Sequence, residues 1–249
     1  MTEKFREKLN SGVVGTFSKA EDPAFIEVMG HAGLDFVIID LEHGPNTVRS
    51  AQNLVRAAQL SGVFPIIRVK EDAPYVMSEA LDIGAGGIQV PQITGRASAQ
   101  EVIKRTKFAP VGERGVCRFV RAANYSAMDR YKYFKSANES VTVLQIEGQS
   151  GIDNLDDILD VEGIDVVFIG PYDLSQSLGV VGDIVTPLVE CKMLEIIDKC
   201  AQKGMAVGTF ADTPQNARKW RDLGVQYIAY SVDVGIFCDA VKGIVNDLK

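Results

Sequence analysis

Two patterns of hydrophobic residues alternate along the chain. Short runs rich in β-branched residues end in Gly, Pro, Asp or Glu, and longer amphipathic runs follow them. The segments FVIIDLEH, VTVLQIE and DVVFIG are almost continuously apolar, which is typical of strands buried on both faces of a helix-covered parallel sheet. We therefore expect eight strands, at residues 12–18, 36–43, 64–69, 87–93, 141–147, 165–170, 206–211 and 227–232.

The segments between the expected strands have helical periodicity. In residues 47–61 and 187–204 the apolar positions recur every three or four residues, which draws one apolar face along each helix. Gly62, Gly204 and Gly224 follow such segments, where a helix end commonly needs a left-handed residue. Each strand is therefore expected to be followed by a helix.

Eight strand–helix units without a linker predict an α/β fold, a (β/α)₈ TIM barrel, with residues 1–249 as one domain. A doubly wound open sheet is the alternative. It is disfavoured because no G-x-G-x-x-G motif follows the first strand. Two gaps, 109–140 and 171–186, are longer than the others, and inserted segments of a barrel often carry function.

Composition excludes several classes of protein. The 249 residues are 46% hydrophobic and 24% charged, which suits a large folded core. A net charge of −7 disfavours partners such as nucleic acid or an anionic membrane surface. The amino-terminal segment has no signal-peptide pattern, and no apolar run is long enough to span a membrane. The four cysteines form no C-x-x-C pair, so we expect reduced thiols in a cytoplasmic protein.

In a TIM barrel the active site lies at the carboxyl ends of the strands, which makes Arg68 a candidate. It sits in the apolar run IIRV, where a buried cation is costly unless it meets an anion. That anion is either a carboxylate on a neighbouring strand or a group of the substrate.

Glu147 and Asp173 follow adjacent predicted strands. Two carboxylates with water and substrate oxygens are a usual way to hold Mg²⁺ or Mn²⁺. The alternative makes Asp173 a helix N-cap and Glu147 an ordinary loop acid. No lysine lies within the end of any predicted strand, which disfavours a Schiff-base mechanism.

His43 follows the second predicted strand, with Asp40 and Glu42 close by in the sequence. A carboxylate beside an imidazole fixes its tautomer and raises its basicity, which suits a general base. We therefore expect His43 to be catalytic.

The sequence resembles the HpcH/HpaI aldolase and citrate lyase family, whose members are metal-dependent pyruvate aldolases on a (β/α)₈ barrel. The resemblance covers most of the chain and is carried, in order, by FVIIDLEHGPN (36–46), PIIRV (65–69), LDIGAGGIQVPQI (81–93), PVGERGV (110–116), VLQIEGQSGIDNLDDIL (143–159) and GPYDLSQSLG (170–179).

The resemblance implies a role for each matching residue. Glu147 and Asp173 match the metal ligands, for Mg²⁺ or Mn²⁺ with Co²⁺ as a further candidate. Arg68 matches an arginine that contacts the pyruvyl oxygen, and His43 matches the catalytic histidine, with Asp40 as its partner. Gln145 matches a glutamine that contacts the substrate, and the backbone of Tyr172–Asp173 matches the segment that meets the pyruvate carboxylate. Asp82 matches an acid that the family presents across a subunit interface.

The implied activity is that of a carbon–carbon lyase, a class II aldolase. It cleaves or forms a 4-hydroxy-2-oxo acid, so that its partners are a small 2-oxo acid and an aldehyde. A citrate-synthase-like condensing enzyme on the same barrel is the alternative, and a ligand-binding barrel or a purely structural oligomer are more distant ones. The resemblance also implies a homo-hexamer, a trimer of dimers that exchange the last helix, 234–248. The segment 117–134 is unusually rich in arginine and aromatic residues and could serve a different second substrate.

Overall fold

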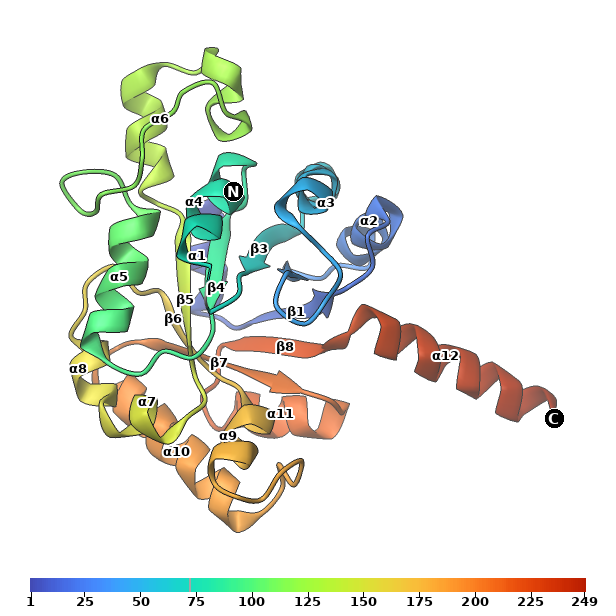
Figure 1. Cartoon of the computed structure of the whole chain (residues 1–249). Helices are drawn as coiled ribbons and strands as arrows, with labels where there is room; N and C mark the ends of the chain where they lie inside the picture. The colour runs from blue at the N-terminus through green and yellow to red at the C-terminus, as the bar shows by residue number, and fades with distance from the viewer. Residues whose placement is uncertain (72) are drawn as a thin grey trace.

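The eight predicted strands form one closed parallel barrel (Figure 1). The structure is a computed structural model that describes residues 1–71 and 73–249. Each strand pairs with the next, and β1 closes the ring by pairing with β8, so the open-sheet alternative is excluded. The strands are β1 (Val13–Ser18), β2 (Phe36–Asp40), β3 (Phe64–Arg68), β4 (Gly87–Val90), β5 (Val141–Ile146), β6 (Val166–Ile169), β7 (Ala206–Ala211) and β8 (Tyr227–Val232).

Five strands end one to three residues before their predicted carboxyl ends. The second strand shows why. The Asp40 carboxylate accepts hydrogen bonds from the backbone N–H groups of Glu42 and His43, and this turns the chain out of the sheet. At the end of β2 a polar side chain thus competes with the ladder for backbone donors.

Helices surround the barrel and begin and end largely where their sequence signals lie. The predicted helix at 47–61 is α3, which is capped by Thr47 and followed by Gly62 at φ 83°. No helix among the described residues is long and apolar enough to cross a membrane. The helices are α1 (Thr2–Leu9), α2 (Pro23–His31), α3 (Val48–Ser61), α4 (Pro74–Asp82), α5 (Arg96–Thr106), the 3₁₀ helix η1 (Arg121–Ser126), α6 (Arg130–Ala137), α7 (Gln149–Asp153), α8 (Leu155–Leu159), α9 (Pro171–Ser177), α10 (Pro187–Gln202), α11 (Pro214–Asp222) and α12 (Asp233–Leu248).

The two ends of the barrel interior differ in chemistry. At the amino-terminal end α1 closes the barrel, and the Phe5 ring stacks on the Phe64 ring with centroids 4.1 Å apart. At the carboxyl-terminal end the buried side chains are polar, among them Asp40, Arg68 and Gln145. One end is therefore a packed plug, and the other can hold polar chemistry.

The last helix, α12, does not pack on its own barrel. Figure 1 shows it extending away from the other helices, and Asp233 is its only buried residue. Apolar side chains are exposed along it, including Phe237, Ile244 and Leu248. The eighth helix of the barrel, α12, is therefore formed, but it does not take its place in the ring of helices around its own barrel.

The predicted insertion between β4 and β5 contains η1 and α6 (Figure 1). It has a small apolar cluster of its own, built on Phe108, Ala123 and Tyr133. The insertion is therefore packed as a unit beside α4 and α5 rather than as surface loops.

Candidate active site

A pocket of about 170 Å³ opens at the carboxyl-terminal ends of the strands. It is lined by residues from the carboxyl-terminal parts of seven strands or from the segments that follow them, namely β1, β2, β3, β5, β6, β7 and β8. Six of the eight predicted site residues line it, namely His43, Arg68, Gln145, Glu147, Tyr172 and Asp173. Residues far apart in the sequence therefore meet here because parallel strands end at one rim.

Arg68 is held rigidly by its neighbouring strand. The β2–β3 register places Asp40 directly beside Arg68, and the buried carboxylate accepts from Nε at 2.9 Å and from Nη2 at 2.7 Å. Arg68 Nη1 lies 3.0 Å from Glu42 Oε2. Burial alone would raise the pKa of Asp40, but the hydrogen bonds and charge of Arg68 hold it below its usual value. The ion pair with a neighbouring strand is therefore present, and Arg68 also lines the pocket.

Glu147 is the most deeply buried acid of the pocket. It is 2% exposed and accepts hydrogen bonds from the Gln92 backbone N–H at 2.8 Å and from Gln145 Nε2 at 2.9 Å. Burial is the main cause that raises the pKa of Glu147 to about 7, and the charges of Asp173 and Glu42 raise it further. The buried carboxylate thus lies in a strongly negative environment.

Glu42 belongs to the same concentration of negative charge. Burial raises its pKa to about 7 against the opposing effect of Arg68, and Asp40 and Asp173 add to the rise. Carboxylates gathered in this way repel one another unless a cation offsets them. Within the described part of the chain, no three acids, histidines or cysteines converge closely enough to hold a metal ion by themselves. Any ion here would complete its ligand set with water or substrate oxygens.

Asp173 lies in the first turn of α9 and not at its cap. The helix begins at Pro171 with Gly170 as N-cap, so the alternative in which Asp173 caps the helix is wrong. Tyr172 is 45% exposed, and its hydroxyl donates to Asp212 Oδ2 at 3.1 Å. The first turn of α9 therefore brings both predicted side chains to the pocket rim.

His43 is at the pocket but is not paired as predicted. Its side chain is 60% exposed, and Nε2 lies 3.8 Å from Glu42 Oε2. Asp40 bonds the backbone N–H of His43 and not its imidazole, because Arg68 takes up the carboxylate. The prediction that Asp40 pairs with the His43 imidazole is therefore wrong. Glu42 is the carboxylate that lies beside the ring.

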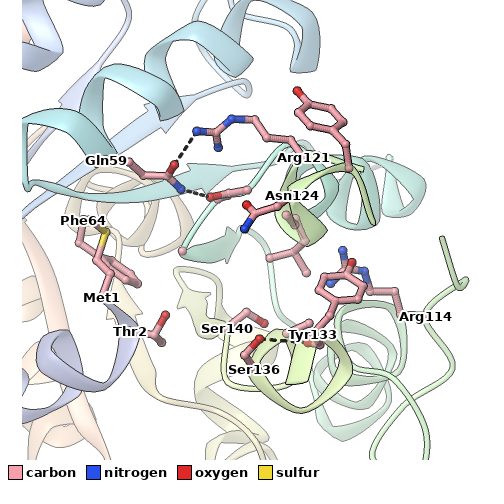
Figure 2. Close-up of a pocket in the computed structure, with 17 residues that line it drawn as sticks. Met1, Thr2, Gln59, Phe64, Arg114, Arg121, Asn124, Tyr133, Ser136 and Ser140 are labelled. Atoms are coloured by element: carbon pink, nitrogen blue, oxygen red, sulfur yellow. Dashed lines mark hydrogen bonds between the residues drawn. The ribbon is translucent and has the colours of Figure 1, made fainter. Parts of the chain in front are cut away.

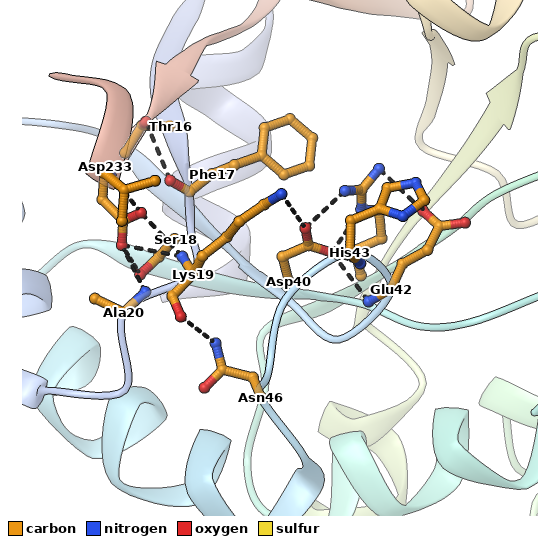
Figure 3. A network of polar contacts seen from close by, with 12 residues as sticks. Thr16, Phe17, Ser18, Lys19, Ala20, Asp40, Glu42, His43, Asn46 and Asp233 are labelled. Carbon is orange, nitrogen blue, oxygen red and sulfur yellow. Dashed lines mark hydrogen bonds and ion pairs between the residues drawn. The ribbon is translucent and has the colours of Figure 1, made fainter. Parts of the chain in front are cut away.

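Lys19 is a site residue that sequence reasoning missed. It follows β1 by one residue and lines the pocket, with Nζ 4.0 Å from Asp40 Oδ2 (Figure 3). Its backbone is fixed on both sides, since Lys19 N–H donates to Asp233 at 3.0 Å and its carbonyl accepts from Asn46 at 3.3 Å. The expectation that no lysine lies at a strand end is therefore wrong. The signal was present, because the first predicted strand stopped directly before it.

Asp82 and the segment 117–134 lie away from this pocket. Asp82 ends α4 and pairs with Arg114 Nη2 at 2.6 Å. None of the residues that line the pocket comes from 117–134. Within one chain, the segment therefore does not contribute to this site.

Known proteins share the whole of this architecture. The sequence profile of the HpcH/HpaI aldolase/citrate lyase family matches residues 14–240. A hydroxypyruvate/pyruvate aldolase from Roseobacter denitrificans is 33% identical over 98% of this chain and 96% of that protein. An HpcH/HpaI aldolase/citrate lyase family protein from Burkholderia cenocepacia J2315 is similar in structure, with a TM-score of 0.93, 32% identity and 98% coverage of both chains. Citrate synthase SbnG is also similar, with a TM-score of 0.87, 28% identity and coverage of 97% of this chain and 96% of that one.

Proposed function

Because the chain belongs to the HpcH/HpaI aldolase/citrate lyase family, we propose that it is a divalent-metal-dependent aldolase that cleaves or forms a 4-hydroxy-2-oxo acid. The products of cleavage are pyruvate and an aldehyde. The observation that carries the proposal is the meeting of Glu147, Asp173 and Arg68 in one pocket at the carboxyl-terminal rim.

The donor set of the pocket fits a hard divalent cation. Glu147 and Asp173 offer carboxylate oxygens. The negative charges of Asp173 and Glu42 repel the buried Glu147 carboxylate, and a cation would offset this repulsion. We assign Glu147 and Asp173 as the ligands, for Mg²⁺ or Mn²⁺ in preference to Co²⁺. When bound, such an ion supplies Lewis-acid polarisation of the carboxylate and keto oxygens of the 2-oxo acid.

The chain's own residues account for the movement of protons and charge. His43 takes the proton from the hydroxyl at C4, and the C3–C4 bonding pair moves into the pyruvyl unit as the aldehyde leaves. Arg68, fixed beforehand by Asp40, donates to the enolate oxygen that develops. The proton held by His43 returns to C3 and gives pyruvate. Gln145 orients substrate or water beside Glu147, and Tyr172 borders the pyruvate end of the pocket.

A metal test and a trapping test separate this chemistry from Schiff-base catalysis. Treatment with EDTA should abolish the cleavage of 4-hydroxy-2-oxo acids, and Mg²⁺ or Mn²⁺ should restore it. Borohydride with pyruvate should leave Lys19 unmodified by mass spectrometry, although it lines the pocket. A pyruvyl adduct on Lys19, or full activity in EDTA, would refute the proposal. A panel of aldehydes with pyruvate and Mg²⁺ then identifies the acceptor.

A condensing enzyme is the second candidate, because the citrate synthase SbnG has the same fold at 28% identity. Incubation with oxaloacetate and an acyl-CoA distinguishes the two. The aldolase should form no citrate under these conditions, whereas the condensing enzyme should form it without a pyruvate-dependent aldehyde reaction.

We propose a cytoplasmic homo-hexamer, a trimer of dimers that exchange α12, in which Asp82 reaches the site of a neighbouring subunit. The exposed apolar side chains of α12 support the exchange.

A further inference from the structure

A buried amide lies behind the active-site pocket, in the interior of the barrel. Gln89 stands on β4, and the strand registers place it beside Arg68 of β3 and Val143 of β5. Its side chain is fully buried. In the described part of the chain it lines neither the active-site pocket nor the larger cavity, of about 390 Å³, at the starts of β3, β4 and β5 (Figure 2). Substrate therefore does not reach Gln89 directly.

The hydrogen bonds of Gln89 join the two ends of the barrel interior. A buried amide is costly unless it is hydrogen-bonded, and Gln89 finds both of its partners among buried side chains. Gln89 Nε2 donates to Gln145 Oε1, and Gln89 Oε1 accepts from the Tyr227 hydroxyl at 3.5 Å. The Tyr227 ring stacks on Phe36, with centroids 4.0 Å apart, in the aromatic plug. One end of the amide is therefore anchored in the plug, and the other reaches a residue of the pocket.

The hydrogen bonds of this chain all run in one direction. The Tyr227 hydroxyl donates to Gln89, and Gln89 donates to Gln145. Gln145 Nε2 then donates to Glu147 Oε2 at 2.9 Å. A glutamine amide has one accepting end and one donating end, whereas an ionised carboxylate only accepts. Since Gln89 occupies the carbonyl oxygen of Gln145, the NH₂ group of Gln145 is the end that faces Glu147.

The orientation of Gln145 decides how firmly Glu147 is held. The Gln92 backbone N–H donates to one oxygen of the carboxylate at 2.8 Å, and Gln145 donates to the other. Without Gln89, the carbonyl oxygen of Gln145 would be a buried acceptor without a donor. Such a group is costly to leave unpaired, so the amide would turn away from this orientation. The Glu147 carboxylate would then keep one donor instead of two.

We propose that Gln89 is a positioning residue for Glu147 and acts through Gln145. The proposal rests on the proposed function, in which Glu147 is a ligand of a divalent cation. With a donor on each oxygen, the carboxylate is held in one orientation and retains lone pairs for the cation. Side chains that orient a metal ligand in this way typically account for about 10–100-fold in metal affinity.

Calorimetric titration of the full chain with Mn²⁺ tests this role without relying on turnover. Gln89→Met removes both hydrogen-bonding ends of the side chain at nearly the same volume, so the barrel interior stays filled. It should weaken Mn²⁺ binding about tenfold. Gln89→Asn, whose amide is one methylene too short to reach Gln145, should weaken it as well. Circular dichroism in EDTA shows that the variants compared are folded.

A double substitution separates positioning from general damage to the barrel. Gln145→Met removes the link itself, so it should weaken Mn²⁺ binding at least as much as Gln89→Met does. In the Gln145→Met background, Gln89→Met should cause no further loss, because its route to Glu147 is already broken. A further tenfold loss in the double variant would overturn the proposal, since Gln89 would then act by another route.

Thr142→Val is the matched control. Thr142 is a fully buried polar residue on the neighbouring strand β5, and its hydroxyl has no hydrogen-bond partner among the described residues. This variant should bind Mn²⁺ as wild type does. If wild type binds Mn²⁺ and the folded Gln89 variants bind it equally well, Gln89 has no positioning role, whereas the metal site stands. If wild type binds no Mn²⁺, the metal-dependent function and the role of Gln89 are both refuted.

Discussion

Arg68 is fixed before any substrate arrives. Its Nε and Nη2 are committed to the buried Asp40, and Nη1 faces Glu42 at 3.0 Å. The plane of the guanidinium is therefore set by the β2–β3 register and does not reorganise during the reaction. Donors preorganised in this way stabilise a developing oxyanion far better than mobile ones.

Replacement of Arg68 should therefore affect turnover more than substrate affinity. Arg68→Ala should lower kcat for pyruvate-forming cleavage by ~10²–10³, the usual loss when one such donor is removed. Arg68→Lys should recover little, because an ammonium cannot bond Asp40 and the substrate in the same plane. Steady-state kinetics with circular dichroism as a folding control measure the effect. Wild-type turnover in well-folded Arg68→Ala would remove this residue from the mechanism.

Lys19 should select among aldehydes by their charge. Its Nζ lies at the pocket, 4.0 Å from an Asp40 that Arg68 already neutralises, so its charge is free to meet a carboxylate on the aldehyde. Lys19→Met should raise KM for carboxylated aldehydes about tenfold and leave neutral aldehydes unchanged. Lys199→Met is a matched control, because both side chains are 31% exposed and lie beside an aspartate. An equal effect on both classes of aldehyde would contradict this role.

The residue types of the site could be predicted from the sequence, but their pairing could not. Arg68 stood out because a cation in an apolar strand requires an anion. Its partner depends on which residue of β2 lies opposite, and the register that sets this is a property of the folded sheet. Asp40 was therefore assigned to its sequence neighbour His43 when it belongs to Arg68. Lys19 was missed although its strand ends where predicted, because the residue that directly follows a strand also reaches the pocket rim.

At the level of elements, the hydrophobic pattern located all eight strands because most residues of each strand are buried or partly buried, whichever face they are on. The second strand ended early because the Asp40 carboxylate accepts from the backbone N–H groups that follow it. The turn from β6 into α9 also depends on a contact that no periodicity reveals. A Cβ atom on Gly170 would lie 2.5 Å from Glu147 Oε2. The glycine is therefore needed for the close approach of two elements.

Gly170→Ala should accordingly damage the site and spare the fold. Alanine tolerates the backbone there, since φ is −87°, but its methyl group must displace a Glu147 carboxylate bonded to Gln92 and Gln145. We expect about 10–100-fold weaker activation by Mg²⁺, as for other losses of ligand support. Metal titration of the activity gives the half-activating concentration.

Gly148→Ala is the matched control for this prediction. The nearest atom to its Cβ would be Gln92 Oε1 at 4.0 Å, an ordinary contact, and the position is also adjacent to Glu147 in the sequence. It should be activated by Mg²⁺ as wild type is. Equal activation of the two variants would show that the close approach at Gly170 is not needed.

At the scale of the whole molecule, the barrel separates two chemistries. Its carboxyl-terminal rim gathers Glu147, Asp173 and Arg68, whereas the amino-terminal end has a cavity walled by Arg114 and Arg121. The sequence marked the residues of the rim as candidates and the segment 117–134, which contains Arg121, as unusually rich in arginine. Only the closed barrel shows that the second set, from the insertion between β4 and β5, faces away from the first.

The remaining feature at this scale is the surface that one chain leaves uncovered. α12 exposes Phe237, Ile244 and Leu248, and α2 exposes Phe25 and Val28. Exposed apolar residues grouped on a helix in this way mark an interface. Since β8 pairs with β1, the helix after β8 would ordinarily pack beside α2, the helix after β1. Exchange of α12 between two copies would cover both surfaces with the contacts of an ordinary barrel, formed between chains.

Removal of α12 should therefore dissociate the oligomer without directly disturbing the residues that line the active-site pocket. A chain truncated after Asp233 keeps the carboxylate that bonds Ser18 and Lys19, so β1 and the pocket rim retain their anchor. We expect wild type to sediment at six times the chain mass of 27.1 kDa and the truncated chain to be smaller, less stable and inactive.

Phe237→Asp in the full chain tests the interface with one side chain and should also dissociate the oligomer. A wild-type protein that is active and sediments as a 27.1 kDa monomer would show that neither the exchange nor a shared site is required.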